Sequence, residues 1–396
     1  MKNSAGMGMK LLAIYVLMAC FATAISLFGQ LLDPIRSYYN ITIEQANTLL
    51  SAQSVGGVLI AVISILYIDS LNQRKIIALA GIMLAVALIS MSVLPLFMVF
   101  WLIFISIGLS TGLINILSNS VLVNIATTNK QRLLTILHMV FSLWAFVMPF
   151  IAQSLYESIG LGQTLLIIGG AILICCAFTF SVFYDEIRMP LITDKLNIRY
   201  RYREVLKVLR KPGMKQIYLL MVLTSIWQMC TIYNVSGAVS LINGRPVEGA
   251  WALSSLFLGM IVSRLLYSTV ADRFSQGKVL AIMNTAGAGL WTAAMLVQDV
   301  ISKIILIGIT AVACGVNFPA IFGASCKIAD KNTAAASGLS ALGYYTAIFV
   351  FCPIVGSLSD IFGYSLALLL LVIPLLLVLP LSILLHRRMR SNENAV

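Results

Sequence analysis

The residues that can do chemistry inside the apolar segments of this 396-residue chain are mostly amides and aromatic rings. Asn115 and Asn119 are four residues apart, so they share one face of a helix. Amides can pair with solute hydroxyls, and aromatic rings can pack on the C–H face of a sugar. Each such side chain can also join two helices or anchor at the interface. As a set they predict a site for a neutral, hydroxylated solute, formed by Gln30, Asn115, Asn119, His138, Trp144, Gln228, Asn234, Asn317 and Tyr344.

Two ionisable side chains lie well inside apolar segments, where a charge is costly and commonly functional. His138 could hydrogen-bond a solute, titrate as a coupling group, or join two helices. Arg264 lies eight residues before Asp272, which places it about 12 Å into the membrane. Its guanidinium could bind a carboxylate or phosphate bidentately, or it could snorkel or brace an inner gate.

Long apolar helices must position these residues. The mean hydropathy of +0.99, with 60% hydrophobic and 10% charged residues, is outside the range of soluble domains. Apolar runs of about 18 residues or more recur and do not alternate with the two-residue period of a transmembrane barrel. We predict an all-α membrane protein with twelve transmembrane helices, at residues 10–32, 45–67, 76–94, 97–126, 133–156, 162–183, 216–240, 249–270, 278–297, 303–326, 334–358 and 363–385.

The distribution of positive charge predicts the orientation. If the N-terminus is inside, most of the 26 Lys and Arg residues fall on the inner side, whereas Arg36, Arg245 and Lys303 fall outside. Both termini are therefore expected in the cytoplasm of a multi-pass protein of the bacterial cytoplasmic (inner) membrane. Anionic lipid headgroups suffice as counter-charge for the net +12, so no nucleic acid is expected as a partner. The first apolar stretch is too long for a cleavable signal peptide.

The chain carries an internal repeat. A polar segment at 184–215 is predicted to link an N-terminal six-helix bundle, residues 1–183, to a C-terminal six-helix bundle, residues 216–396. Identities recur between these halves at a constant offset of 203 residues, which indicates duplication. They include Leu50-Ser51 with Leu253-Ser254, Gly56 with Gly259, Asp69 with Asp272, Lys75 with Lys278, and Gly112 with Gly315; at the same offset Ser154–Gly160 falls on Ser357–Gly363.

Other kinds of chemistry are not indicated. The seven cysteines lie in or at the ends of apolar helices without CxxC spacing, and the chain has only two histidines. We therefore expect no metal site, no disulfide framework and no cofactor. The sequence has no nucleotide-binding loop or catalytic triad, so an enzyme is not expected.

The loop after the second helix of each half carries a motif. The second copy reads Val270-Ala271-Asp272-Arg273 with Lys278 and Leu280, and the first keeps Asp69, Arg74, Lys75 and Ile77. In these residues the chain resembles the major facilitator superfamily, whose signature here is G-x-L-A-D-R-x-G-R-K-x-x-L. That resemblance implies two six-helix halves with a substrate site between them at the midplane. It also implies a gating role for Asp69, Arg74, Lys75, Asp272, Arg273 and Lys278.

A narrower resemblance is to the fucose-permease-like fucose/glucose/galactose:proton symporters. It rests on Arg132-Leu133, Ser263-Arg264, Phe318–Gly323 and Pro353–Asp360. That family also carries an arginine at the place of Arg264, which favours a bracing or gating role for this residue. The family carries acids in helices 1 and 4 where this chain has Gln30 and Asn115. Because an amide cannot take up a proton, the family's coupling mechanism does not follow for this chain.

The sequence thus predicts a secondary active or facilitative transporter that moves a small hydrophilic solute, a sugar or polyol, by alternating access. Two alternatives remain: an organic-anion (monocarboxylate) carrier using Arg264, and a drug or metabolite exporter. The stretch Ala145–Ala152 has Pro149 but lacks the glycines of drug:proton antiporters, which disfavours export. The expected partners are the small-molecule substrate, H+ or Na+ as coupling ion, and membrane lipids, and the protein is expected to be a monomer.

Overall fold

The computed structural model describes residues 2–67, 71–125, 130–187, 198–270, 274–329 and 333–393, and these residues are almost entirely helical. The helices follow the chain as α1 (Lys2–Tyr39), α2 (Ile43–Tyr67), α3 (Gln73–Met91), α4 (Phe97–Ile125), α5 (Lys130–Val182), α6 (Tyr184–Ile187), α7 (Ile198–Leu209), α8 (Met214–Asn243), α9 (Pro246–Val270), α10 (Gln276–Leu296), α11 (Val300–Cys314), α12 (Asn317–Ala329), α13 (Thr333–Phe362), α14 (Tyr364–Leu369) and α15 (Val372–Glu393).

Within the described residues, eleven helical segments are long and apolar enough to cross a membrane. One of them, in α5, is interrupted at Gly160, which has φ 78° and ψ 174°, so α5 supplies two spans. The twelve predicted spans are therefore present. Two of them are discontinuous: the tenth is divided into α11 and α12, and the twelfth into α14 and α15.

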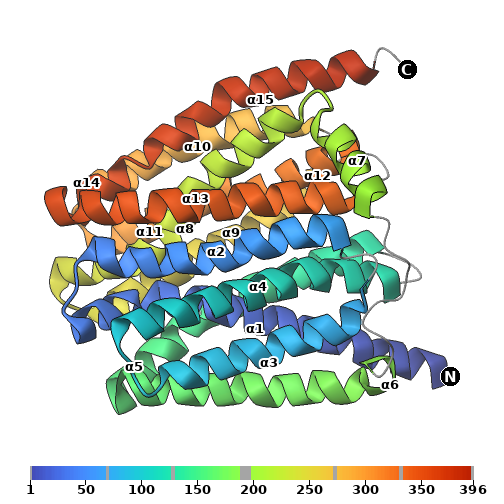
Figure 1. Ribbon diagram of the computed structural model, residues 1–396. Helices are drawn as coiled ribbons and strands as arrows, with labels where there is room; N and C mark the ends of the chain where they lie inside the picture. Colours follow the sequence, from blue (N-terminus) through green and yellow to red (C-terminus); the bar gives the residue numbers. More distant parts are fainter. Residues whose placement is uncertain are drawn as a thin grey trace.

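The two halves repeat the same packing. In the first half α1 packs on α5, α2 on α4, and α3 on α4 and α5; in the second half α8 packs on α13, α9 on α11, and α10 on α11 and α15. Between the halves, α2 packs on α13 and α5 on α9. Gly56 lies against the α4 backbone, and Gly259, 203 residues later, lies against the α11 backbone. The fold is thus two pseudo-symmetric six-helix bundles (Figure 1).

The repeated loops have the same local structure. Gly160 and Gly363 both adopt a positive φ, at 78° and 82°, which L side chains disfavour. Asn72 accepts from the Lys75 backbone N–H at the start of α3, and Ser275 accepts from that of Lys278 at the start of α10. Each half therefore enters its third helix through a side-chain N-cap at the same place in the repeat.

The helices run roughly parallel, and the N-terminus, the end of α15 and α7 lie at one end of the bundle, on the right in Figure 1. We call this the terminal side and the opposite end the far side. Lys303, predicted outside, lies on the far side and donates from Nζ to Ala294 O and Met295 O. Asp299 accepts from Ser302 N there, and its hydrogen bonds to Ser302 hold the pKa of its carboxyl below the usual value. Which compartment each side faces, and where each half ends, remain predictions.

Candidate functional site

A cavity lies between the two halves, in the middle and the terminal-side part of the bundle. The empty volume of the cavity, including the part that is open to solvent, is about 880 Å3. Both halves contribute to its walls, which are mainly apolar with a few polar groups. The lining residues are Met18, Phe21, Ile25, Asn115, Ile116, Asn119, His138 and Phe141 from the first half, and Gln228, Met229, Ile232, Arg264, Phe318, Phe322, Ala341 and Tyr344 from the second.

The structure brings five of the predicted substrate-binding residues together in this cavity: Asn115, Asn119, His138, Gln228 and Tyr344. Asn119 donates from Nδ2 to the Asn115 backbone O at 2.7 Å, which leaves its carbonyl oxygen available. The Gln228 amide has one weak contact, with Met260 Sδ at 3.9 Å. These amides and the phenol of Tyr344 can therefore accept and donate towards a solute.

Arg264 is the charged residue among those that line the cavity. Its Nη1 donates to His138 O at 3.2 Å and to Ser142 Oγ, both on α5 of the other half. Nε is buried and has no hydrogen-bond partner in the described part of the chain. Arg264 thus connects the halves, as a brace would, and also lines the cavity.

Aromatic rings from both halves line the cavity. Phe318 and Phe322 are stacked, with centroids 6.1 Å apart and an interplanar angle of 7°. The His138 ring lies 6.1 Å from Phe318, and Phe21 lies 5.1 Å from Phe141. Ring faces of this kind pack well against the C–H groups of a solute.

Four predicted substrate-binding residues lie outside the cavity. Trp144 is 40% exposed and donates from Nε1 to Thr23 Oγ1 at 2.6 Å. Asn317 exchanges two amide hydrogen bonds with Asn284, at 2.7 and 2.9 Å, inside the second half. Gln30 and Asn234 belong to contacts between the halves on the far side. Their role in substrate binding remains a prediction.

Those far-side contacts are buried and polar. Asn47 of α2 and Asn234 of α8 exchange amide hydrogen bonds at 3.0 and 3.2 Å, and both are at most 1% exposed. Gln30 of α1 donates to Gln153 Oε1 at 2.7 Å and accepts from the Ser236 hydroxyl at 2.8 Å. The Gln30–Ser236 and Asn47–Asn234 pairs join α1 and α2 to α8, so they close the far side above the cavity, whereas the Gln30–Gln153 bond lies within the first half.

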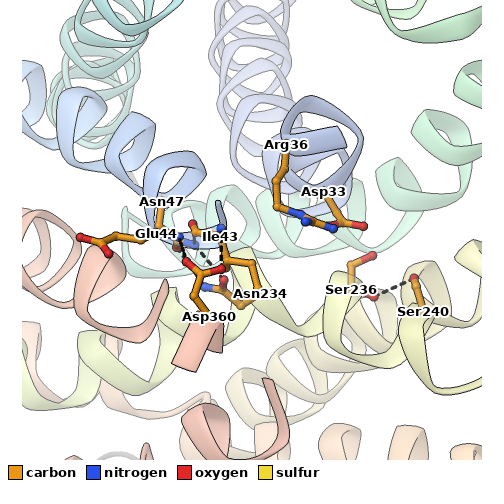
Figure 2. A network of polar contacts seen from close by, with 9 residues as sticks. All are labelled: Asp33, Arg36, Ile43, Glu44, Asn47, Asn234, Ser236, Ser240 and Asp360. Atoms are coloured by element: carbon orange, nitrogen blue, oxygen red, sulfur yellow. Dashed lines mark hydrogen bonds and ion pairs between the residues drawn. The ribbon is translucent and has the colours of Figure 1, made fainter. Parts of the chain in front are cut away.

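The start of α2 completes this closure (Figure 2). Four backbone donors at a helix N-terminus have no partner within the helix. Thr42 and Gln45 form a reciprocal capping box at 3.0 and 3.1 Å. The backbone N–H groups of Ile43 and Glu44 then donate to the two carboxylate oxygens of Asp360, at 3.0 and 2.8 Å. Asp360 lies on α13, so the second half caps a helix of the first.

Among the described residues, this cap has no counterpart at the other interface between the halves, where α5 packs on α9. Glu157 stands 203 residues before Asp360, and Pro246 stands 203 residues after Ile43. Proline has no backbone N–H to donate. Glu157 instead accepts from Gln153 Nε2 at 2.7 Å. In the described part of the chain, the cap therefore couples α2 to α13 and has no equivalent between α5 and α9.

Of the predicted gating residues, Asp69, Asp272 and Arg273 lie outside the described residues. Arg74, Lys75 and Lys278 lie in the first turns of α3 and α10. The prediction omitted Gln153, Ser236 and Asp360, as well as the aromatic rings that line the cavity. The repeat aligns Asp360 with Glu157 in sequence. Only the three-dimensional structure places Asp360 at the start of α2, beside the capping box of Thr42 and Gln45.

Comparison with known proteins shows which family has this arrangement of helices. The model of the Major Facilitator Superfamily matches residues 14–243, more than half of the chain. No curated protein sequence matches. A bacterial homolog of the human lysosomal transporter Spinster, inward-facing and unoccupied, superposes with a TM-score of 0.77 at 13% identity, covering 96% of this chain and 97% of that one. Its inward-facing, occupied structure gives 0.69 at 14% identity, with 95% and 96% covered.

A sugar transporter has the same fold. The Escherichia coli fucose:proton symporter, in an asparagine-to-alanine variant, superposes with a TM-score of 0.70 at 14% identity, covering 95% of this chain and 98% of that one. At such identities the likeness concerns the fold alone. Together with the match of the family model, it establishes that this chain belongs to the major facilitator superfamily of membrane transporters.

Proposed function

We propose that this protein is a secondary carrier that moves a small hydroxylated solute, a sugar or a close derivative, by alternating access. The cavity between the halves is the binding site. The observation that carries the proposal is the position of its polar groups: Asn115 and Asn119 come from one half, and Gln228 and Tyr344 from the other. A solute that is hydrogen-bonded to the polar groups of both halves is therefore coupled to any movement of one half relative to the other.

The far-side contacts support the alternating-access part of the proposal. With Asn47 paired to Asn234 and Asp360 capping α2, the solute site is separated from the far side. Transport then requires these contacts to open while contacts on the terminal side form. With both termini in the cytoplasm, as positive charge indicates, this conformation is the inward-facing one.

Transport is tested by counterflow of labelled sugars in proteoliposomes, with and without a pH gradient. Asn119→Ala and Gln228→Ala should each raise the half-saturating concentration about 3–10-fold, because each removes one hydrogen bond to a hydroxyl. Asn243→Ala is the matched control: this asparagine is exposed on the far side and bonds Glu248 at 3.1 and 3.3 Å. The proposal fails if no sugar or sugar derivative gives counterflow. A dependence on the pH gradient would identify H+ as the coupling ion.

A further inference from the structure

The guanidinium of Arg264 has an unused edge. Its two hydrogen bonds, to His138 O and Ser142 Oγ, both come from Nη1. Nε is buried without a partner among the described residues, and the hydrogen bonds that Arg264 makes to described side chains and backbone use Nη1 and not Nη2. An arginine binds a carboxylate through two parallel N–H groups, and the Nε–Nη2 edge is one of its two such faces. This edge therefore has no partner, and because Nε is buried an anion binds it side-on once the side chain turns towards the cavity that Arg264 lines.

The cavity wall supplies no negative charge to this cation. Its described lining residues include amides, aromatic rings and aliphatic side chains but no Asp or Glu. The acids on the neighbouring helices are engaged on the far side: Asp33 with Arg36, Glu157 with Gln153, and Asp360 with the start of α2. A cation removed from water without a counter-ion is strongly unfavourable. The missing charge is thus best supplied by the solute.

We infer that the solute is a sugar acid, a hydroxylated ring or chain that carries one carboxylate. This inference rests on the proposed function and names its substrate class. The carboxylate binds across Nε and Nη2 of Arg264, and the hydroxyls bind Asn115, Asn119 and Gln228. The C–H face packs on Phe318, whose ring is held by its stack with Phe322.

Other solute classes leave groups of the site without partners. A neutral sugar leaves the Arg264 charge uncompensated. An apolar carboxylate such as benzoate leaves the amides of Asn115, Asn119 and Gln228 unpaired, and an unpaired polar group in a dry site is unfavourable. A phosphate dianion carries more charge than the single cation compensates. A monocarboxylate with hydroxyls fits every group that faces the cavity.

The position of Arg264 also connects solute binding to the movement of the halves. The residue belongs to α9 of the second half, and both of its present partners belong to α5 of the first. A carboxylate on the free edge is held by the same guanidinium that joins these helices. The Arg264 side chain therefore binds the carboxylate of the solute and also holds the contact between α9 and α5.

The test is binding to the purified full-length protein, measured by thermal shift and by titration calorimetry. The probes are glucuronate, galacturonate and gluconate, each beside its neutral counterpart glucose, galactose or sorbitol, with benzoate as the apolar carboxylate. At least one acid should bind about 10–100-fold more tightly than its neutral counterpart, the range of a charge-assisted hydrogen-bonded pair. Arg264→Gln should reduce that preference to within about twofold.

Two further variants keep the test decisive if Arg264→Gln does not fold. Arg264→Lys keeps the charge but not the bidentate geometry, so it should retain only part of the preference. Asn119→Ala should weaken an acid and its neutral counterpart by the same factor, because it contacts a hydroxyl that both share.

The outcomes separate this inference from the proposed function. Neutral sugars that bind as tightly as their acids would overturn the inference and leave the carrier proposal in place. Benzoate binding more tightly than every sugar acid would overturn the role of the hydroxyls. If no probe bound and none gave counterflow in proteoliposomes, the proposed function itself would fail.

Discussion

Replacing Asp360 with Ala should open the far side of the protein. The carboxylate accepts hydrogen bonds from the N–H groups of Ile43 and Glu44, which have no other partner among the described residues. Loss of a helix N-cap costs about 0.5–2 kcal/mol, and loss of a negative charge at a helix N-terminus about 0.3–1 kcal/mol. Because Asp360 is exposed, the two costs together are about 1–2 kcal/mol. The ratio of far-side-closed to far-side-open protein should therefore fall about 5–30-fold.

The effect can be measured with a cysteine in place of Ala46. This residue is 1% exposed and lies on α2 between the halves on the far side. A membrane-impermeant maleimide reacts with it only when the far side opens, so the labelling rate follows the open population. The parent protein, which has seven free cysteines of its own, supplies the background rate. Asp360→Asn keeps one acceptor oxygen, so it should change the free energy of far-side closure by about half as much as Asp360→Ala.

Asp299→Ala is the matched control. Asp299 also caps a helix, α11, but its partner Ser302 belongs to the same half. Its loss should lower thermal stability without raising the labelling rate at position 46. If Asp360→Ala left the labelling rate unchanged, or if Asp299→Ala raised it equally, the cap between the halves would not hold the far side closed.

The other predictions concern packing, turns and the amide pair. Gly108→Ala should lower the melting temperature strongly and reduce expression, because a Cβ there overlaps the backbone of α2; Gly170→Ala, with open space around it, should be neutral or stabilising by about 0.5–1 kcal/mol. Gly363→Ala should cost about 1–2 kcal/mol in a thermal or denaturant series, since its φ is 82°, and a neutral result would contradict the strain argument. Asn234→Ala should leave Asn47 with unpaired amide groups and raise far-side labelling; unchanged labelling would show that the pair does not hold the halves together.

The repeat explains why local features were predictable. A positive φ, a helix cap and a close backbone contact each need particular residue types within a few positions. Gly160 and Gly363, Asn72 and Ser275, and Gly56 with Gly259 therefore stand at one offset in sequence and have the same structural role in each half. These features follow from local chemistry.

The partners of the buried amides could not be predicted in the same way. A transmembrane helix is apolar on all sides, so its sequence has little periodicity to indicate which face meets the cavity. Adjacent residues on a helix point about 100° apart. Asn119 and Asn317 look alike in sequence, yet the first lines the cavity and the second is paired with Asn284.

The sequence by itself determined the membrane class, the twelve spans, the duplication and the superfamily, because these depend on composition and on spacing along the chain. Tertiary structure alone decided that Arg264 has neutral partners and a free edge, and that Asp360 caps a helix 316 residues away in sequence. Both depend on how the two halves meet. That contact is set by helix rotation and packing between distant segments, which local sequence does not encode.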